Sequence, residues 1–172
     1  MNAVQSSAFN SHVARKNTQT LVSKLPPRPV LQTLVDVFFA EVNWHYFILE
    51  RFYFDDLFSR WPHSEELEPV SYLRPEELSR ELRYFSALLF QVVSLTLQFL
   101  PPDHLDMAQI SADALGTSQT YSDLGDELLS ALGRSGAALS GVQADFLRSS
   151  WLKNVGRGTE AWHAFGNAIR FA

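Results

Sequence analysis

The chain has 172 residues, 46% of them hydrophobic and 13% aromatic, which is enough for one domain with a packed core and excludes a wholly disordered protein. It contains no cysteine, which excludes disulfides, thiolate zinc sites, iron–sulfur clusters and cysteine nucleophiles. Its net charge is -5, and from Asp36 onward the acidic residues outnumber the basic ones, so a phosphate-binding nucleic-acid surface is not expected.

The first 24 residues are rich in Ser, Asn and Thr and show no sustained hydrophobic period. This composition predicts a disordered, flexible leader over residues 1–24, followed by a helical domain over residues 25–172. Pro29 suits the first turn of a helix, because its missing N–H is no loss there. After it, apolar residues recur mostly at three- and four-residue steps: Val30, Leu31, Leu34, Val35, Phe38 and Val42. The spacing predicts the first helix of the domain.

The segment from Trp44 to Trp61 is densely aromatic. We expect residues 47–49 to be extended and a short helix to begin at Asp55 and to end before Pro62. Residues 62–75 carry several glutamates and prolines, which is typical of a solvated connector.

The strongest helical pattern runs from Pro75 to Pro101. Pro75, Glu76 and Glu77 suit a first turn, because a proline fits there and the helix dipole favours acidic side chains. Beyond Arg83 the pattern loses its charged side, so we expect the second half of this helix to be surrounded by other helices. Polar residues interrupt its apolar run, which favours a buried helix over a membrane span.

Four helices are predicted in the remaining chain, over residues 106–115, 118–132, 142–155 and 162–172. Short Gly- and Ser-containing turns join the last three, and helices linked in that way tend to pack as antiparallel pairs. No long alternating run typical of a sheet occurs in the sequence. The predicted class is therefore all-α, built of stacked antiparallel helical hairpins.

Two segments carry a resemblance to a known family. The first segment has the order Leu25, Pro26, Pro27, Arg28, Pro29, Leu34, Val35, Phe38, Phe39, Val42, Asn43, Phe47, Ile48 and Leu49. The second has the order Gly156, Arg157, Ala161, Trp162, Gly166, Ala168, Ile169 and Arg170. The pattern resembles the regulatory "middle homology" domain of fungal binuclear-zinc-cluster transcription factors, over about residues 25–172. Phe47 stands where the family has a proline.

The resemblance implies a nuclear protein that controls transcription through protein partners or a small-molecule effector. Because the family's domain normally continues beyond the position of Ala172, we expect this chain to correspond to its first half. The family's DNA-reading module needs six cysteines and this chain has none, so direct nucleic-acid binding is not implied. No membrane association is expected.

Trp162, Gly166 and Arg170 share one helix face, since they are four residues apart. We interpret this face as packing, with Trp162 in a groove, Gly166 beside a neighbouring helix and Arg170 paired with a buried carboxylate or a helix end. The alternative is a ligand-sensing face. Gly156 and Arg157 are interpreted as a helix-to-helix turn, because the lysine and the preceding strand of a phosphate-binding loop are missing.

We expect no catalytic, cofactor-binding or metal site, and no enzyme activity. Several pairs of polar residues invite such roles: Glu160 with His163, Glu41 with His45, Asp55 with Asp56, and Glu76 with Glu77 and Glu81. The Glu-x-x-His step lacks the second copy that di-iron bundles need. Helix-dipole complementarity and solvation account for the paired carboxylates without chemistry.

The function expected is thus that of a transcription-factor regulatory domain without its own DNA-binding module. The alternative is a free-standing helical scaffold that binds other proteins through its aromatic face. A helix over residues 162–171 with an uncovered apolar face also predicts that the isolated chain dimerises or aggregates. Light scattering on the purified protein tests this self-association.

Overall fold

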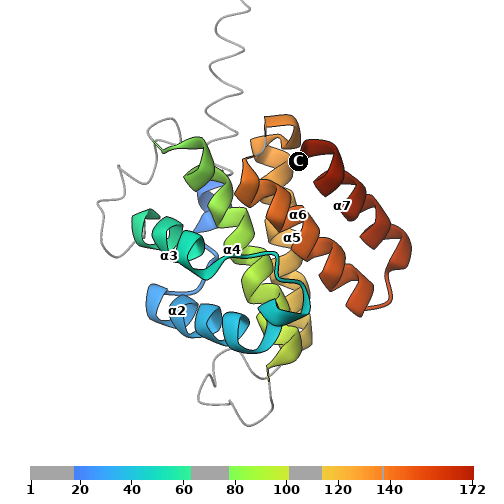
Figure 1. Cartoon of the computed structure of the whole chain (residues 1–172), viewed down its shortest axis with the longest axis horizontal. Helices are drawn as coiled ribbons and strands as arrows, with labels where there is room; N and C mark the ends of the chain where they lie inside the picture. The colour runs from blue at the N-terminus through green and yellow to red at the C-terminus, as the bar shows by residue number, and fades with distance from the viewer. Residues whose placement is uncertain (1–17, 63–77, 101–113, 137) are drawn as a thin grey trace, which may run out of the picture.

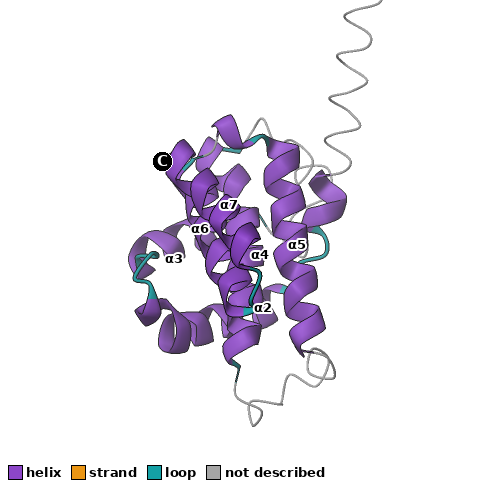
Figure 2. Ribbon diagram, turned by 90° about the vertical axis from the view of Figure 1, so that its right-hand side faces the viewer, coloured by secondary structure: helices purple, strands orange, loops and turns teal. Residues whose placement is uncertain are grey.

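The computed structural model describes residues 18–62, 78–100, 114–136 and 138–172, and every regular element within these ranges is helical (Figures 1 and 2). The predicted all-α class is therefore confirmed. The α-helices are α2 (Arg28–Val37), α3 (Arg51–Arg60), α4 (Arg80–Phe99), α5 (Ala114–Leu132), α6 (Leu139–Asn154) and α7 (Gly158–Phe171).

Helix α4 lies at the centre of the molecule, with α2 and α3 on one side and α5, α6 and α7 on the other (Figure 1). Most of its residues are buried, including the polar side chains of Gln91, Ser94 and Thr96. Each of these three side chains bonds to a backbone carbonyl. The helix is long and apolar enough to cross a membrane, but 83% of its most apolar window is buried inside the structure. The prediction of a helix surrounded by other helices is confirmed.

Helical structure is present nearer the N-terminus than the sequence indicated. Residues 18–22 are helical, and Leu21 and Val22 are buried in the core. The prediction of a flexible leader is therefore wrong for residues 18–24, because this apolar pair packs against the core instead of being solvated. Residues 1–17 lie outside the described part of the chain.

Helix α2 begins after Pro27 and continues through a π-helical segment (Phe38–Val42) and a 3₁₀ turn (Asn43–His45). The chain then turns at Phe47, whose φ of 49° lies in the left-handed region. Residues 47–49 are consequently not the simple extended segment that was predicted. The Asn43 side chain explains the turn, since it donates to Leu49 O at 2.9 Å and accepts from Leu49 N at 3.3 Å.

Helix α3 begins at Arg51 rather than at Asp55, because the Glu50 side chain caps it. The Glu50 carboxylate accepts from the backbone N–H groups of Phe52 (3.1 Å) and Tyr53 (2.6 Å). At the other end, Arg28 donates to the carbonyl of Phe58 at 3.1 Å and packs over its ring. This contact joins the start of α2 to the end of α3.

Helix α4 begins at Arg80, with Ser79 as its N-cap. The first turn expected at residues 75–77 lies outside the described residues. Helix α5 begins at Ala114 and includes Gly116, which had been expected to end a separate helix over residues 106–115. Residues 101–113 also lie outside the described chain.

The close approach of α4 and α5 requires a glycine. A Cβ atom at Gly125 would overlap the Gln91 amide nitrogen and lie 3.0 Å from Phe90 Cβ. Gln91 uses that amide nitrogen to donate to Ser122 O at 2.9 Å. Glycine therefore places α5 close enough for polar groups to bond across the interface.

Helices α6 and α7 form the antiparallel hairpin that the short turn between them predicted (Figure 1). Gly156 closes α6 with a φ of 79°, a conformation that glycine adopts without steric cost. The buried side of α7 consists of small residues, Ala161, Ala164 and Ala168. Their size lets α7 lie close against α6.

Candidate functional site

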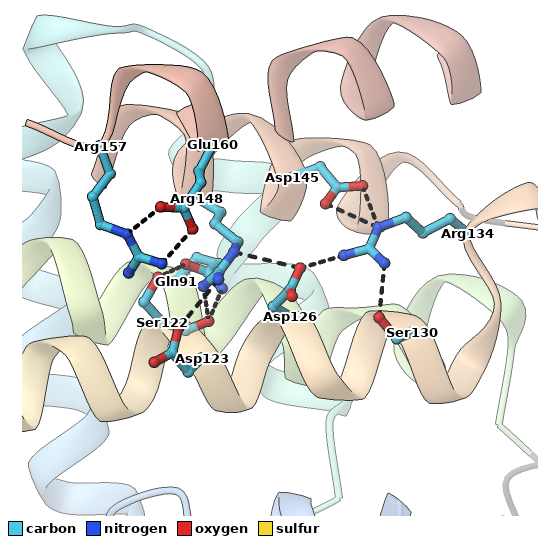
Figure 3. Close-up of polar contacts among 10 residues, drawn as sticks. All are labelled: Gln91, Ser122, Asp123, Asp126, Ser130, Arg134, Asp145, Arg148, Arg157 and Glu160. Carbon is cyan, nitrogen blue, oxygen red and sulfur yellow. Dashed lines mark hydrogen bonds and ion pairs between the residues drawn. The ribbon is translucent and has the colours of Figure 1, made fainter. Parts of the chain in front are cut away.

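Asp145 and Arg148, the buried charged residues of the described chain, lie on α6 and belong to a group of ion pairs between α5 and α6 (Figure 3). Arg148, only 8% exposed, donates to Ser122 O at 2.6 Å and to Ser122 Oγ at 2.9 Å. It also donates to Asp123 Oδ1 at 3.1 Å. Because Gln91 bonds to the same Ser122 carbonyl, this group of contacts ties α4, α5 and α6 together.

A second arginine extends this network toward the turn between α5 and α6. Arg134 donates to both carboxylate oxygens of Asp145 at 3.2 Å, to Ser130 Oγ at 2.8 Å and to Asp126. Asp126 also pairs with Arg148 Nε at 3.4 Å, so that it bridges the two arginines. We call these residues, with Gln91, Ser122 and Asp123, the polar network.

Asp145 is the buried acid of this network, with 2% of its surface exposed. Burial raises its pKa from 3.8 to about 6, against the opposing attraction of Arg134. A perturbed acid is a functional candidate in general. Here both of its oxygens accept from one arginine and solvent barely reaches it, so we assign the polar network a structural role.

An open groove lies between α6, α7 and the Tyr46 segment. Its volume is about 490 Å³, within the range of ligand-binding pockets. Aromatic rings dominate its lining, which consists of Tyr46, Phe146, Ser149, Ser150, Lys153, Gly158, Ala161, Trp162 and Phe165. The Lys153 ammonium lies 5.5 Å from the centre of the Tyr46 ring. We call this hollow the α6–α7 groove.

The polar residues that line the α6–α7 groove are two serines and one lysine. Ser149 and Ser150 both donate to the Phe146 carbonyl, at 2.7 and 3.3 Å, so their oxygens remain able to accept. Lys153 is the charged residue of the lining, and no carboxylate of the described residues lines the groove. The groove is thus an aromatic surface with a cation at its edge.

Apolar surface continues from the groove along α7. Trp162 is 72% exposed and Ile169 is 64% exposed. A Cβ added at Gly166, between them, would meet no described atom within 4 Å. Seven residues bring Ile169 back nearly over Trp162, so these residues form one stripe, which we call the α7 outer stripe.

The structure overturns the packing interpretation of Trp162, Gly166 and Arg170. Trp162 and Arg170 are exposed, and no neighbouring helix in the described chain approaches Gly166. The reason is that α7 turns its alanines toward α6, which leaves the opposite face to solvent.

The two remaining residues of the C-terminal motif, Gly156 and Arg157, lie in the turn between α6 and α7. Arg157 Nε donates to Glu160 at 2.7 Å, and a second guanidinium nitrogen donates to the other carboxylate oxygen. The pKa of Glu160 is lowered from its usual value by these bonds. Both side chains are substantially exposed, and the pair marks the first turn of α7.

The other paired polar residues are separated or already bonded. Asp55 accepts from Arg51 at 2.7 Å, and Glu81 accepts from Ser140 N at 2.7 Å. The His45 ring stacks on Trp44 with centroids 3.7 Å apart. Glu76 and Glu77 lie outside the described chain. Among the residues that the structure describes, no group of three or more His, Asp or Glu side chains could hold a metal ion.

Sequence reasoning did not identify the groove. One indication was available, since Phe146, Ser149, Ser150 and Lys153 follow three- and four-residue steps and therefore share one face of α6. Tyr46 could not be found in that way, because 100 residues separate it from Phe146 and no local pattern links them.

Compared with family models, with curated proteins and with solved structures, the chain has no match in any of the three. What the chain does has therefore to be inferred from its own residues.

Proposed function

We propose that this chain is a helical regulatory domain that acts through contacts with other proteins. The α7 outer stripe carries this proposal, because Trp162 and Ile169 expose large apolar side chains beside an aromatic groove. Contiguous apolar surface of this kind is typical of interaction sites in folded proteins. Tryptophan is also among the residues that contribute most to binding at protein interfaces.

The finer proposal is the regulatory domain of a fungal zinc-cluster transcription factor, located in the nucleus and without a DNA-binding module of its own. The C-terminal pattern from Gly156 to Arg170 supports it, because the residues that carry the resemblance include Trp162, Gly166 and Ile169 of the α7 outer stripe. In such a role the partner would bias the packing of α7, which is held to α6 through small alanine side chains.

A tethered reporter assay tests this function. The chain is fused to a heterologous DNA-binding domain and an activation domain in fungal cells, and transcription of a reporter gene is measured. We expect the wild-type chain to change reporter output and Trp162→Ser to remove that change. Leu115→Ser is the matched control, because Leu115 is an exposed apolar residue of a different helix, α5.

Equal reporter output with and without the chain would contradict the regulatory role. Equal output from the wild type and Trp162→Ser, both differing from the fusion without the chain, would show regulation that does not use α7. Protein levels measured by immunoblot distinguish either result from loss of the fusion protein.

One observation favours the free-standing scaffold as the second candidate. Trp44, Phe47 and Phe52 are exposed around the start of α3 and provide a second aromatic surface. A scaffold with two binding surfaces would leave the tethered reporter unchanged. Its partner binding would instead be reduced by Phe47→Ser and Phe52→Ser, as measured with purified partner.

A further inference from the structure

The shape of the exposed apolar surface favours an elongated occupant. The α6–α7 groove takes in Trp162 and Phe165, and the α7 outer stripe continues to Ile169, two turns from Trp162. A rise of 1.5 Å per residue places Trp162 and Ile169 about 10 Å apart along the helix axis. A compact small molecule in the groove would leave Ile169 uncovered, whereas a helix laid along α7 would cover both.

Cations flank this surface on both sides. Lys153 lines the groove, and Arg170 follows Ile169 on the far side of the α7 outer stripe. At 100° per residue, Phe165 lies about 60° from Trp162 in one direction and Arg170 about 80° in the other. Neither Lys153 nor Arg170 forms an ion pair within the described chain.

The described residues of α6 and α7 offer no free acidic group to this surface. Glu160 is the acidic residue of α7, and Arg157 occupies both of its carboxylate oxygens. On α6, Asp145 is buried and bound by Arg134. Within the described chain, the exposed apolar surface therefore has positive charge without an acidic partner at its edges, although the chain as a whole carries a net charge of -5.

We propose that the α6–α7 groove and the α7 outer stripe bind an acidic amphipathic helix of a partner protein. Its apolar residues would contact Trp162, Phe165 and Ile169, and its carboxylates would face Lys153 and Arg170. Binding of an amphipathic helix in an apolar groove is a common recognition mode, and complementary charge sets its specificity. This inference rests on the proposed function and names the chemistry of the partner.

A second copy of this chain fits the surface less well. An α7–α7 pair would bring two positively charged surfaces together, and neither α7 offers a free carboxylate to the other. Like charges brought together at an interface are destabilising. Self-association through α7 is accordingly an outcome that the test distinguishes.

The test uses two labelled synthetic peptides with the same length as α7, 14 residues. The acidic peptide carries Leu and Phe at helical spacing, flanked by Glu, and the basic peptide has Lys in place of every Glu. Binding to the full chain is measured by fluorescence anisotropy. We expect the acidic peptide to bind at least about tenfold more tightly than the basic one, a difference that one or two charge contacts supply.

Charge reversal provides the matched comparison. Lys153→Glu should weaken the acidic peptide about tenfold and strengthen the basic one, and Arg170→Glu should act in the same direction. Lys24→Glu changes the net charge equally at an exposed residue that does not line the groove, and should leave both affinities nearly unchanged. Equal effects of Lys153→Glu and Lys24→Glu, or a preference for the basic peptide, would overturn the inference.

The outcomes separate this inference from the proposed function. If neither peptide binds while the reporter still depends on Trp162, the acidic-helix inference fails and the regulatory role stands. If the acidic peptide binds as expected but the reporter does not respond, the groove has its ligand and the regulatory role fails. Self-association of the chain that Trp162→Ser abolishes, seen by sedimentation, would make a second copy the occupant and overturn the inference.

Discussion

The centre and the edge of this molecule place their side chains in opposite ways. Between α4, α5 and α6, small and polar residues such as Ser94, Ser118 and Ser122 are fully buried. On the outer face of α7, the large apolar residues Trp162 and Ile169 are exposed. From side-chain chemistry alone, the serines would be expected at the surface and the tryptophan and isoleucine in the core.

The contrast follows from how closely the helices approach. In the centre, Gly125 and the serines bring α4 and α5 together, and the buried polar groups bond across the gap. Ser94 and Ser118 each donate to the other's backbone carbonyl at 2.7 Å, and Trp151 donates to Ser118 Oγ at 2.8 Å. Buried polar groups that are fully bonded specify one arrangement of helices. The apolar residues on the outer face of α7, by contrast, have no such contacts with the described residues to cover them.

Replacing the two tryptophans of this comparison should give the largest difference in stability. Trp151 is buried and hydrogen-bonded, so Trp151→Ala should lower the free energy of unfolding by about 3–5 kcal/mol. Trp162→Ala should change it by less than about 0.5 kcal/mol, since its ring is mostly in water. Urea denaturation measures both values. A comparable loss in the two variants would mean that α7 is covered in solution.

The arginines offer the next comparison. Arg148→Ala removes the cation that pairs with Asp123, one of the two cations that pair with Asp126, and a donor to Ser122 O, and should cost about 2–4 kcal/mol. Arg157→Ala removes an exposed pair with Glu160 and should leave the denaturation midpoint unchanged. A midpoint for Arg148→Ala equal to that of the wild type would show that the polar network contributes nothing.

Stability should also depend on pH through Asp145. Because its pKa is about 6 in the folded protein and near 3.8 when unfolded, the folded state binds a proton more readily between these values. The contribution of Asp145 to the free energy of unfolding is thus fully present below about pH 3.8 and is lost as the pH rises through 6. Between pH 4 and pH 7 the wild type should lose about 2–3 kcal/mol relative to Asp145→Asn.

Urea denaturation of the wild type and of Asp145→Asn between pH 4 and pH 7 checks the sign of this pH dependence. If the difference between them grows in favour of the wild type as the pH rises, Asp145 is held as a stabilising carboxylate and its pKa is not raised. Other acids change both proteins equally, so the difference isolates Asp145.

Alanine substitutions at two glycines should change the stability of the protein in opposite directions. These are the smallest effects expected. Gly125→Ala forces Gln91 away from Ser122 and crowds Phe90, which should cost about 1–3 kcal/mol. Gly166→Ala adds a methyl group in open space within a helix and should stabilise the protein by about 0.5–1 kcal/mol. Thermal unfolding of both variants measures the two shifts. Destabilisation by Gly166→Ala would indicate that another surface approaches α7.

The sequence predicted the helical class, the burial of α4 and the α6–α7 hairpin, because hydrophobic period and turn residues are local properties. It did not predict which face of α7 is covered. The Trp162–Gly166–Arg170 face and the alanine face have similar helical spacing, and only the position of α6 decides between them. An indication was present in the alanine spacing, since small residues permit close helix packing.

The polar network lay beyond sequence patterns for a similar reason. Asp145 and Arg148 are three residues apart on α6 and would suit a solvated face. Their burial depends on Arg134 and Asp126, which become neighbours only after α5 and α6 have packed. The early start of α3 depends on a local contact, but the sequence does not indicate it, because Glu50 is not one of the residue types that usually cap a helix.

The four tryptophans differ in their exposure, so tryptophan fluorescence can be used to monitor the surface of α7. Trp61 and Trp151 are buried and hydrogen-bonded to serine hydroxyls, while Trp44 is stacked on a histidine. Trp162 is the most exposed of the four. Iodide quenching of intrinsic emission would thus act on Trp162 and Trp44 and not on the two buried rings, and a partner covering α7 would protect Trp162 alone.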